Sequence, residues 1–195
     1  RDMGIGALQA FEVSRSELEA MHAGKAFDVL INRNIATGAT MAVRRRVIRT
    51  APQVPDGWVH DEWLALVASL VGRADTYERV LIDYRQHGGN QIGAKRRTWR
   101  ERMGGVITRG MYMRRIIERT RALLDRTEGE SKLAMTDSQR RQVAMRLAHA
   151  QARLALPEAF IPRLRLVARE AVTGRYWRYS SGWRSVFSDL ARLRR

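Results

Sequence analysis

Hydrophobic residues recur at helical spacing early in the chain. Ser14-Arg15-Ser16-Glu17 matches a capping box, which satisfies free amide groups at the start of a helix. Leu18, Met21, Phe27 and Leu30 then supply part of an apolar face. This pattern predicts helical structure from residue 14 to about residue 32.

A second helical pattern begins at Asp61 and ends at Gly72. Its apolar residues recur at positions i, i+3, i+4 and i+7, and they are Trp63, Leu66, Val67 and Leu70. Asp61 is a typical residue for the start of a helix, and a glycine commonly follows the end of one. We therefore expect one helix over residues 61–71.

Two other stretches have the pattern of β-strands. Val80, Ile82 and Tyr84 recur at every second position, the period of a strand with one wetter face. Residues 35–43 are rich in small and β-branched side chains, and residues 44–50 could form a helical turn. We expect residues 35–43 and 79–86 to lie in one sheet covered by the helix 61–71. The predicted fold class of this half is α/β, with too few strands for a complete sheet.

The second half of the sequence predicts a mainly α-helical extension. Residues 98–125 form a long helical pattern, and Thr136-Asp137-Ser138-Gln139 is another capping box at the head of a helix. A further helix is expected near Pro157 and Pro162, and it should end at about Gly174.

The charge of the chain is concentrated in this helical half. The net charge is +16. Residues 1–95 carry 12 Lys and Arg against 11 Asp and Glu, a balance of +1, whereas residues 96–195 carry 24 against 9, a balance of +15. The change at Lys95-Arg96-Arg97 predicts two domains, residues 1–95 and 96–195.

Composition excludes several classes of protein. The chain has no cysteine, so disulfides and thiolate chemistry are excluded, and a metal would need oxygen or imidazole ligands. The longest apolar run, residues 64–71, is far shorter than the roughly 20 residues needed to span a bilayer. No signal-peptide pattern is present. We therefore expect a cytoplasmic protein, and the first residue, Arg1, favours an internal fragment.

Three short segments have residues suited to chemistry at a binding site. Asp61 could act as a general base held at a helix start, or it could only cap the helix. Gly38 could let the backbone approach a ligand closely, or it could mark a bend. His87, at the glycine turn 88–89, could be a metal ligand or a surface residue.

Taken together, these segments resemble the family-two glycosyltransferases of the GT-A fold, especially the bacterial rhamnosyltransferase-like members that build surface polysaccharides. The resemblance covers residues 1–95 and rests on three motifs in the order of that family. They are N-x-x-T-G-x-T-M-x-x-R-R over residues 34–45, H-D-x-W over residues 60–63 and Y-R-Q-H-x-x-N over residues 84–90.

The resemblance implies an inverting transfer of a sugar, such as rhamnose, from a nucleotide-sugar donor to a glycan or lipid-linked acceptor. It implies Asp61 as the catalytic base. Substrate contacts are implied for Thr37, Gly38, Thr40, His60, Trp63 and Arg85. It also implies His87 as one ligand of a divalent metal ion, Mg or Mn.

The half that would bind the nucleotide is missing from the sequence. The resemblance implies that the other metal ligands, an Asp-x-Asp pair, precede residue 1. We therefore expect a carboxy-terminal fragment or a truncated gene product, and a chain that is inactive by itself.

Aromatic and basic residues are interleaved near the end of the chain. The aromatic residues are Tyr176, Trp177, Tyr179, Trp183 and Phe187. The arginines beside them are Arg175, Arg178, Arg184, Arg192, Arg194 and Arg195. This composition suits an anionic membrane surface on the inner face of the cell membrane. It also suits nucleic acid or a helical packing module with an aromatic core. A basic helical nucleic-acid-binding module is the alternative function, but no helix-turn-helix, zinc or RNA-binding signature supports it.

Overall fold

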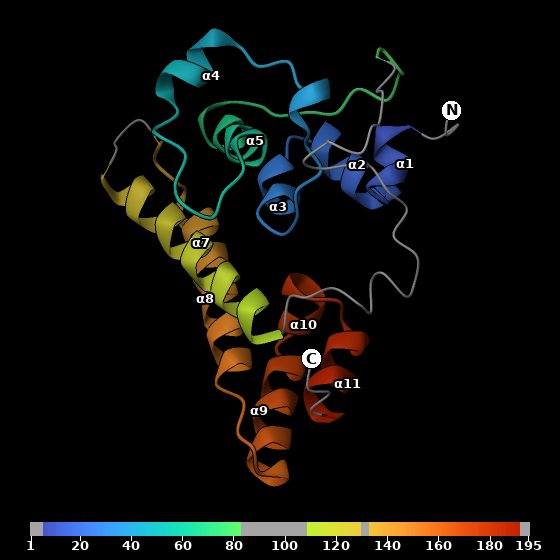
Figure 1. Cartoon of the computed structure of the whole chain (residues 1–195), viewed down its shortest axis with the longest axis vertical. Coiled ribbons are helices and arrows are strands. Elements are labelled where there is room, and N and C mark those ends of the chain that lie inside the picture. Colours follow the sequence, from blue (N-terminus) through green and yellow to red (C-terminus); the bar gives the residue numbers. More distant parts are fainter. Residues whose placement is uncertain (1–5, 83–108, 130–132, 192–195) are drawn as a thin grey trace. The chain divides into compact units, whose positions relative to one another are not determined.

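The computed structural model describes residues 6–82, 109–129 and 133–191. All regular elements in these ranges are helical (Figure 1). They are α1 (Ala7–Ala10), α2 (Arg15–His22), α3 (Ala26–Leu30), the 3-10 helix η1 (Gly38–Thr40), α4 (Arg45–Thr50), α5 (His60–Val71), α7 (Arg109–Gly129), α8 (Asp137–Leu154), α9 (Phe160–Val172), α10 (Arg175–Tyr179) and α11 (Trp183–Ala191). The α/β fold class expected from the sequence is therefore wrong, because the described residues form an all-α structure without a strand.

The two expected strands are the source of this error. Residues 35–43 contain η1, and residues 79–82 have no regular structure, while residues 83–86 lie outside the described ranges. A strand is stabilised by hydrogen bonds to a neighbouring strand, and neither segment has such a neighbour among the described residues. Val80, Leu81 and Ile82 are all exposed. The two-residue period of the apolar side chains therefore does not correspond to one buried and one exposed face.

The described residues form two compact units. The first contains residues 6–54 and 58–82, and the second contains residues 55–57, 109–129 and 133–191. The composition break at residue 95 lies outside the described ranges. The division into domains 1–95 and 96–195 therefore stays a prediction.

The core of the first unit is built around α5. Trp63, Leu66 and Val67 on this helix are completely buried, as its apolar spacing predicts. α5 packs against α3 and α4, and α2 packs against α3 (Figure 1). Since no sheet is present among the described residues, the expectation that this helix covers a sheet is wrong.

The predicted helix over residues 14–32 is divided into α2 and α3. Ser14 caps α2 as expected, and its side chain accepts a hydrogen bond from the backbone of Glu17. Gly24 then adopts a φ of +77°, a backbone conformation that residues with a side chain rarely adopt. The chain turns at this glycine before α3 begins. The sequence pattern continues across this turn because Phe27 and Leu30 also belong to the core.

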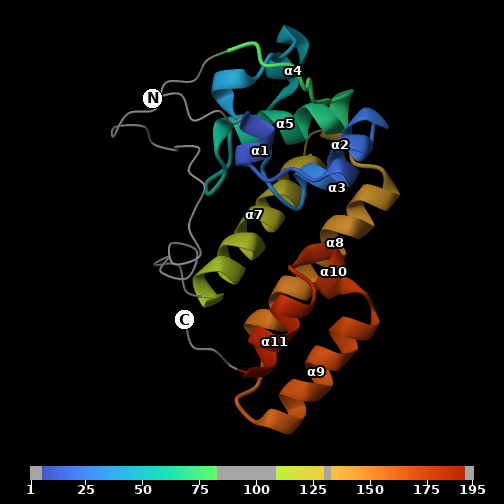
Figure 2. The same ribbon diagram turned by 90° about the vertical axis from the view of Figure 1, so that its right-hand side faces the viewer.

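Clusters of buried apolar side chains join the helices of the second unit. Met113, Ile116, Ile117 and Ala150 bury the face shared by α7 and α8. A second cluster of Val167, Tyr176 and Val186 joins α9, α10 and α11, which Figure 2 shows gathered at one end of this unit. The capping box at Thr136 starts α8 as expected. For the predicted helix 98–125, the described part is α7, and residues 98–108 lie outside the described ranges.

Candidate functional site

The start of α5 meets the loop that contains η1, although 23 positions separate Gly38 and Asp61 in the sequence. The backbone N–H of Gly38 donates a hydrogen bond of 2.9 Å to Oδ2 of Asp61. This contact brings together two of the three motifs on which the glycosyltransferase resemblance rests.

Gly38 allows this close approach because it lacks a side chain. A Cβ atom at this position would lie 3.0 Å from Nε2 of His60, so the exposed His60 ring would have to shift by a few tenths of an ångström. His60 and Gly38 are both exposed, and so is Thr40. A ligand lying over this loop would therefore meet an exposed imidazole and an exposed glycine.

Asp61 lies in the first turn of α5 and is not its N-cap, because the helix begins at His60 and Val59 occupies the cap position. The second carboxylate oxygen of Asp61 accepts a hydrogen bond of 2.7 Å from the backbone N–H of Glu62. Negative charge is favoured at this end of a helix. Each carboxylate oxygen has two lone pairs, and Asp61 is buried, with 7% of its surface exposed.

The other substrate-binding residues expected from the sequence are divided between surface and core. Thr37 is half-buried and occupies the N-cap position of η1 without a hydrogen bond from its side chain to the first turn. Trp63 has no exposed surface, its ring N–H donates to the carbonyl of Pro52 at 3.2 Å, and its ring packs edge-on against Trp58. Trp63 therefore serves the core in this structure, and its predicted contact with substrate stays a prediction.

Arg85 and His87 lie outside the described residues, so their roles as a substrate contact and a metal ligand stay predictions. Within the described ranges, no group of three histidine and carboxylate side chains is placed to hold a metal ion. The described residues therefore do not fit a complete centre for the expected Mg or Mn ion.

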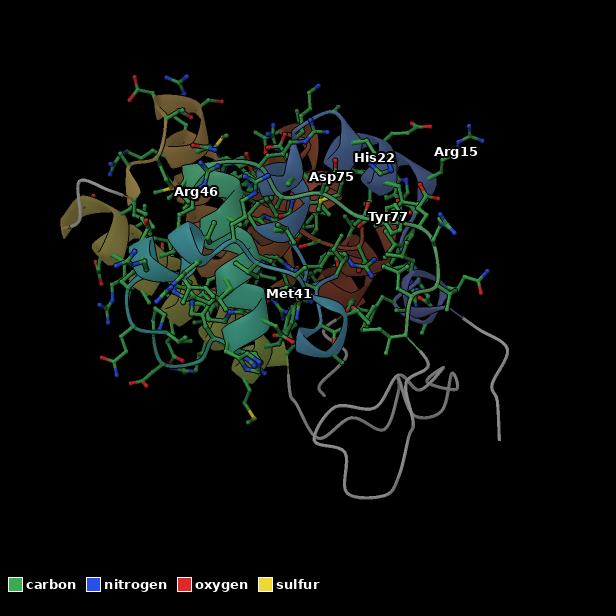
Figure 3. All side chains as sticks on the ribbon, turned by 90° about the horizontal axis from the view of Figure 1, so that it is seen from above. Arg15, His22, Met41, Arg46, Asp75 and Tyr77 are labelled. Carbon is green, nitrogen blue, oxygen red and sulfur yellow. The ribbon has the colours of Figure 1, made fainter. Side chains whose placement is uncertain are left out.

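Sequence reasoning missed a polar cluster around His22, at the end of α2. Its Nδ1 lies 2.7 Å from Asp75 Oδ1, and its Nε2 lies 3.1 Å from Glu78 Oε1. Figure 3 shows His22 and Asp75 together at one side of the unit. The hydrogen bonds to Glu78 and Asp75 raise the pKa of His22 above 6.5. The cluster holds the segment after α5 against α2, and no sequence motif marks it.

Sequence reasoning also missed a buried polar network in the second unit. His149 donates through Nδ1 to Glu170 at 2.8 Å, and its Nε2 lies 3.0 Å from the hydroxyl oxygen of Ser180. Burial lowers the pKa of His149 below 6.5 despite the hydrogen bond to Glu170. Neutral His149 therefore accepts a hydrogen bond from the Ser180 hydroxyl through Nε2, while Ser180 accepts a hydrogen bond of 2.7 Å from Arg153.

The serine, histidine and glutamate are ordered as in a nucleophilic triad. However, only 2% of His149 is exposed, and the Arg153 guanidinium donates to the oxygen that would attack. A hydrogen bond from the Arg153 guanidinium occupies a lone pair of the Ser180 oxygen and lowers its nucleophilicity. We therefore assign this chain of hydrogen bonds a structural role.

Asp189 is the centre of the other half of the same network. Arg153 donates to both of its carboxylate oxygens, at 2.7 and 3.1 Å, and Arg109 lies 3.0 Å away. The hydroxyl of Tyr176 also donates to Asp189, at 2.7 Å. Burial and this hydrogen bond raise the pKa of Tyr176 far above its usual range. Asp189 thus links α7, α8, α10 and α11.

The aromatic residues of the tail do not form a single core. Tyr176 is completely buried, whereas Trp177, Trp183 and Phe187 are exposed. Of the alternatives left open by the sequence, an aromatic core therefore fits Tyr176 and does not fit Trp177, Trp183 and Phe187.

No protein-family model, curated protein or solved structure matches the chain. Among the described helices, none is both long enough and apolar enough to cross a membrane.

Proposed function

We propose that the first unit supplies the acceptor side of a sugar-transfer site, with Asp61 as the general base. The observation that carries this proposal is the hydrogen bond between the Gly38 amide and Asp61. It joins the T-G-x-T loop to the H-D-x-W helix start, and these are two of the motifs typical of family-two glycosyltransferases.

The reaction is a single displacement at the anomeric carbon of a nucleoside diphosphate sugar. The acceptor hydroxyl gives its proton to Asp61 as its oxygen forms the new glycosidic bond. The bond from the anomeric carbon to the diphosphate breaks, and the configuration of the sugar is inverted. A divalent metal would stabilise the departing diphosphate. That His87 is one ligand of this metal stays a prediction.

The chain's own residues contribute position and charge to this reaction. Two backbone amides fix the orientation of the Asp61 carboxylate, and a base must be held within hydrogen-bond reach of the proton that it accepts. Gly38 keeps the adjacent surface free of a side chain. Exposed His60 and Thr40 are available to acceptor hydroxyl groups.

The test is sugar transfer by an Asp61→Asn variant of the longest polypeptide that carries this chain. Release of nucleoside diphosphate from a panel of nucleoside diphosphate sugars would be followed with Mg and Mn ions and glycan acceptors. We expect turnover to fall by about 10²- to 10⁴-fold, because asparagine cannot accept the proton. Donor binding should change little.

Asp61→Asn also removes one of two hydrogen-bond acceptors for backbone amides, which should cost about 1 kcal/mol of stability. Activity must therefore be measured well below the melting temperature of the variant. Asp28→Asn, an exposed carboxylate on α3, is the matched control and should keep full turnover. Normal turnover of Asp61→Asn with a lowered melting temperature would show that Asp61 only holds the loop to the helix.

A further inference from the structure

Three exposed aromatic side chains form a continuous patch on the second unit, and we call it the aromatic patch. Trp177 comes from α10, and Trp183 and Phe187 come from α11. The ring of Trp183 lies 5.2 Å from that of Trp177 and 6.1 Å from that of Phe187, measured between centroids. The three residues are 47%, 60% and 65% exposed, respectively.

The turn between the two helices holds this patch in place. Gly182 has a φ of +54°, and its N–H donates to the carbonyl of Tyr176 at 3.0 Å. A Cβ atom on Gly182 would lie only 3.2 Å from the indole ring of Trp177. The indole therefore rests directly on the glycine backbone, which orders this ring without burying it.

The opposite faces of α10 and α11 already have partners. Tyr176 and Val186 are buried against Val167 of α9, and Asp189 is buried in the polar network. The two helices are thus fixed to the unit through these residues, and the aromatic patch lies outside that core.

The exposed charged side chains of residues 160–191 all have the same sign. Residues 160–191 are all described, and they contain two acidic residues, Glu170 and Asp189, which are 1% and 0% exposed. The exposed charged residues of this segment are Arg165, Arg169, Arg178 and Arg184. Both acidic side chains are paired with arginines, so the surface of this segment presents positive charge without exposed negative charge.

We propose that the aromatic patch docks the protein on an anionic membrane surface. Indole rings are favoured at the level of the lipid headgroups, where an apolar ring and a polar N–H are both accommodated. Exposed arginines beside such rings are attracted to anionic lipids. This inference goes beyond sugar transfer, and it involves a different unit from Asp61, so each can fail without the other.

The test is co-sedimentation of the full chain with two kinds of vesicle. One consists of phosphatidylcholine alone, and the other of equal parts phosphatidylcholine and phosphatidylglycerol. We expect binding to the anionic vesicles and much weaker binding to the neutral ones. Trp177→Ala with Trp183→Ala should weaken anionic binding by about tenfold or more, because these rings supply the apolar contact.

A second variant tests the charges without touching the patch. Arg178→Glu with Arg184→Glu should weaken binding to anionic vesicles by about 30-fold or more, because each basic residue near the surface contributes to binding. Arg114→Glu with Arg121→Glu makes the same change of net charge at exposed positions of α7 and is the matched control. Equal losses in the two charge variants would mean that net charge alone drives binding, and would overturn the proposal.

Circular dichroism separates loss of binding from loss of folding. The tryptophan variant and the Arg178/Arg184 variant both change exposed side chains, so their melting temperatures should stay close to that of the wild type. If the tryptophan variant unfolds, the proposal is tested by comparing vesicle binding of the Arg178/Arg184 variant with that of its control on α7. Equal binding to both kinds of vesicle, or to neither, would overturn the proposal. Tighter binding to single-stranded DNA than to anionic vesicles, or a dimer that the tryptophan variant dissociates, would assign the patch to a different partner.

Discussion

The imidazole of His22 connects two segments that are distant in the sequence. It bonds to Asp75 and Glu78, which follow α5, while the guanidinium of Arg73 donates to the carbonyl of His22 and to Asp75. Partial burial tends to raise the pKa of Asp75, but hydrogen bonds from Thr76, His22 and Arg73 lower it overall. The contact is therefore strongest where His22 is protonated and Asp75 is ionised.

The raised pKa of His22 predicts the pH dependence of this contact. A raised pKa in the folded state means that the stabilising effect is fully present below 6.5 and is lost as the pH rises through the folded-state pKa. NMR titration of the His22 ring should give a pKa above 6.5. Asp75→Asn with Glu78→Gln should return this pKa toward 6.5. A His22 pKa that does not change in this double variant would contradict the proposed hydrogen bonds.

The capping boxes are local signals, and the two that begin at Ser14 and Thr136 correctly predict where α2 and α8 start. The apolar spacing of residues 61–71 also predicts α5 and its buried face. A capping box and an apolar stripe each depend on residues within a few turns of one another. The sequence can therefore specify these elements without knowledge of the rest of the chain.

Strands depend on partners that the local sequence does not specify. Residues 35–43 have a composition typical of a strand, yet several of their backbone N–H groups bond within the loop. The amide N–H of Ala36 donates to Oδ1 of Asn34, and the N–H groups of Thr40 and Met41 each donate to the carbonyl three positions earlier. The pairing of Gly38 with Asp61 likewise required the structure, since neither residue alone distinguishes a functional contact from a cap or a bend.

The buried network was unpredictable for a related reason. Arg153, Glu170 and Asp189 are charged residues, and such residues are almost always exposed unless they are paired. Arg153 on α8 pairs with Asp189 on α11, and Glu170 on α9 pairs with Arg175 on α10. No periodic pattern indicates these pairings. His149 is buried in the same way, and its neutral form is what the network requires.

Loss of Asp189 should therefore destabilise the second unit strongly. Asp189→Ala leaves Arg153 and the Tyr176 hydroxyl without their buried acceptor, and breaking such a pair costs about 3–5 kcal/mol. Urea denaturation would measure this loss. Glu128→Ala is the control, because it removes an exposed ion pair with Arg140 and should cost at most about 1 kcal/mol. Similar costs for the two variants would show that the network contributes little to folding.

The charge of the whole molecule is distributed unevenly. The net charge is +16, and nearly all of it belongs to residues 96–195. Exposed like charges repel one another, and a large net charge destabilises the compact state. The same charges attract an anionic surface, so folding and membrane docking respond to them in opposite ways.

Added salt should separate these two effects. Salt screens repulsion among the exposed arginines, with a Debye length of about 10 Å at 0.1 M ionic strength, so sodium chloride should raise the melting temperature of the wild type. The same addition should weaken binding to anionic vesicles steeply, since that attraction is screened as well. Differential scanning calorimetry and co-sedimentation over one salt series would measure both. Vesicle binding that is insensitive to salt would mean that the exposed arginines do not contribute to docking, and a falling melting temperature would mean that favourable ion pairs outweigh the repulsion.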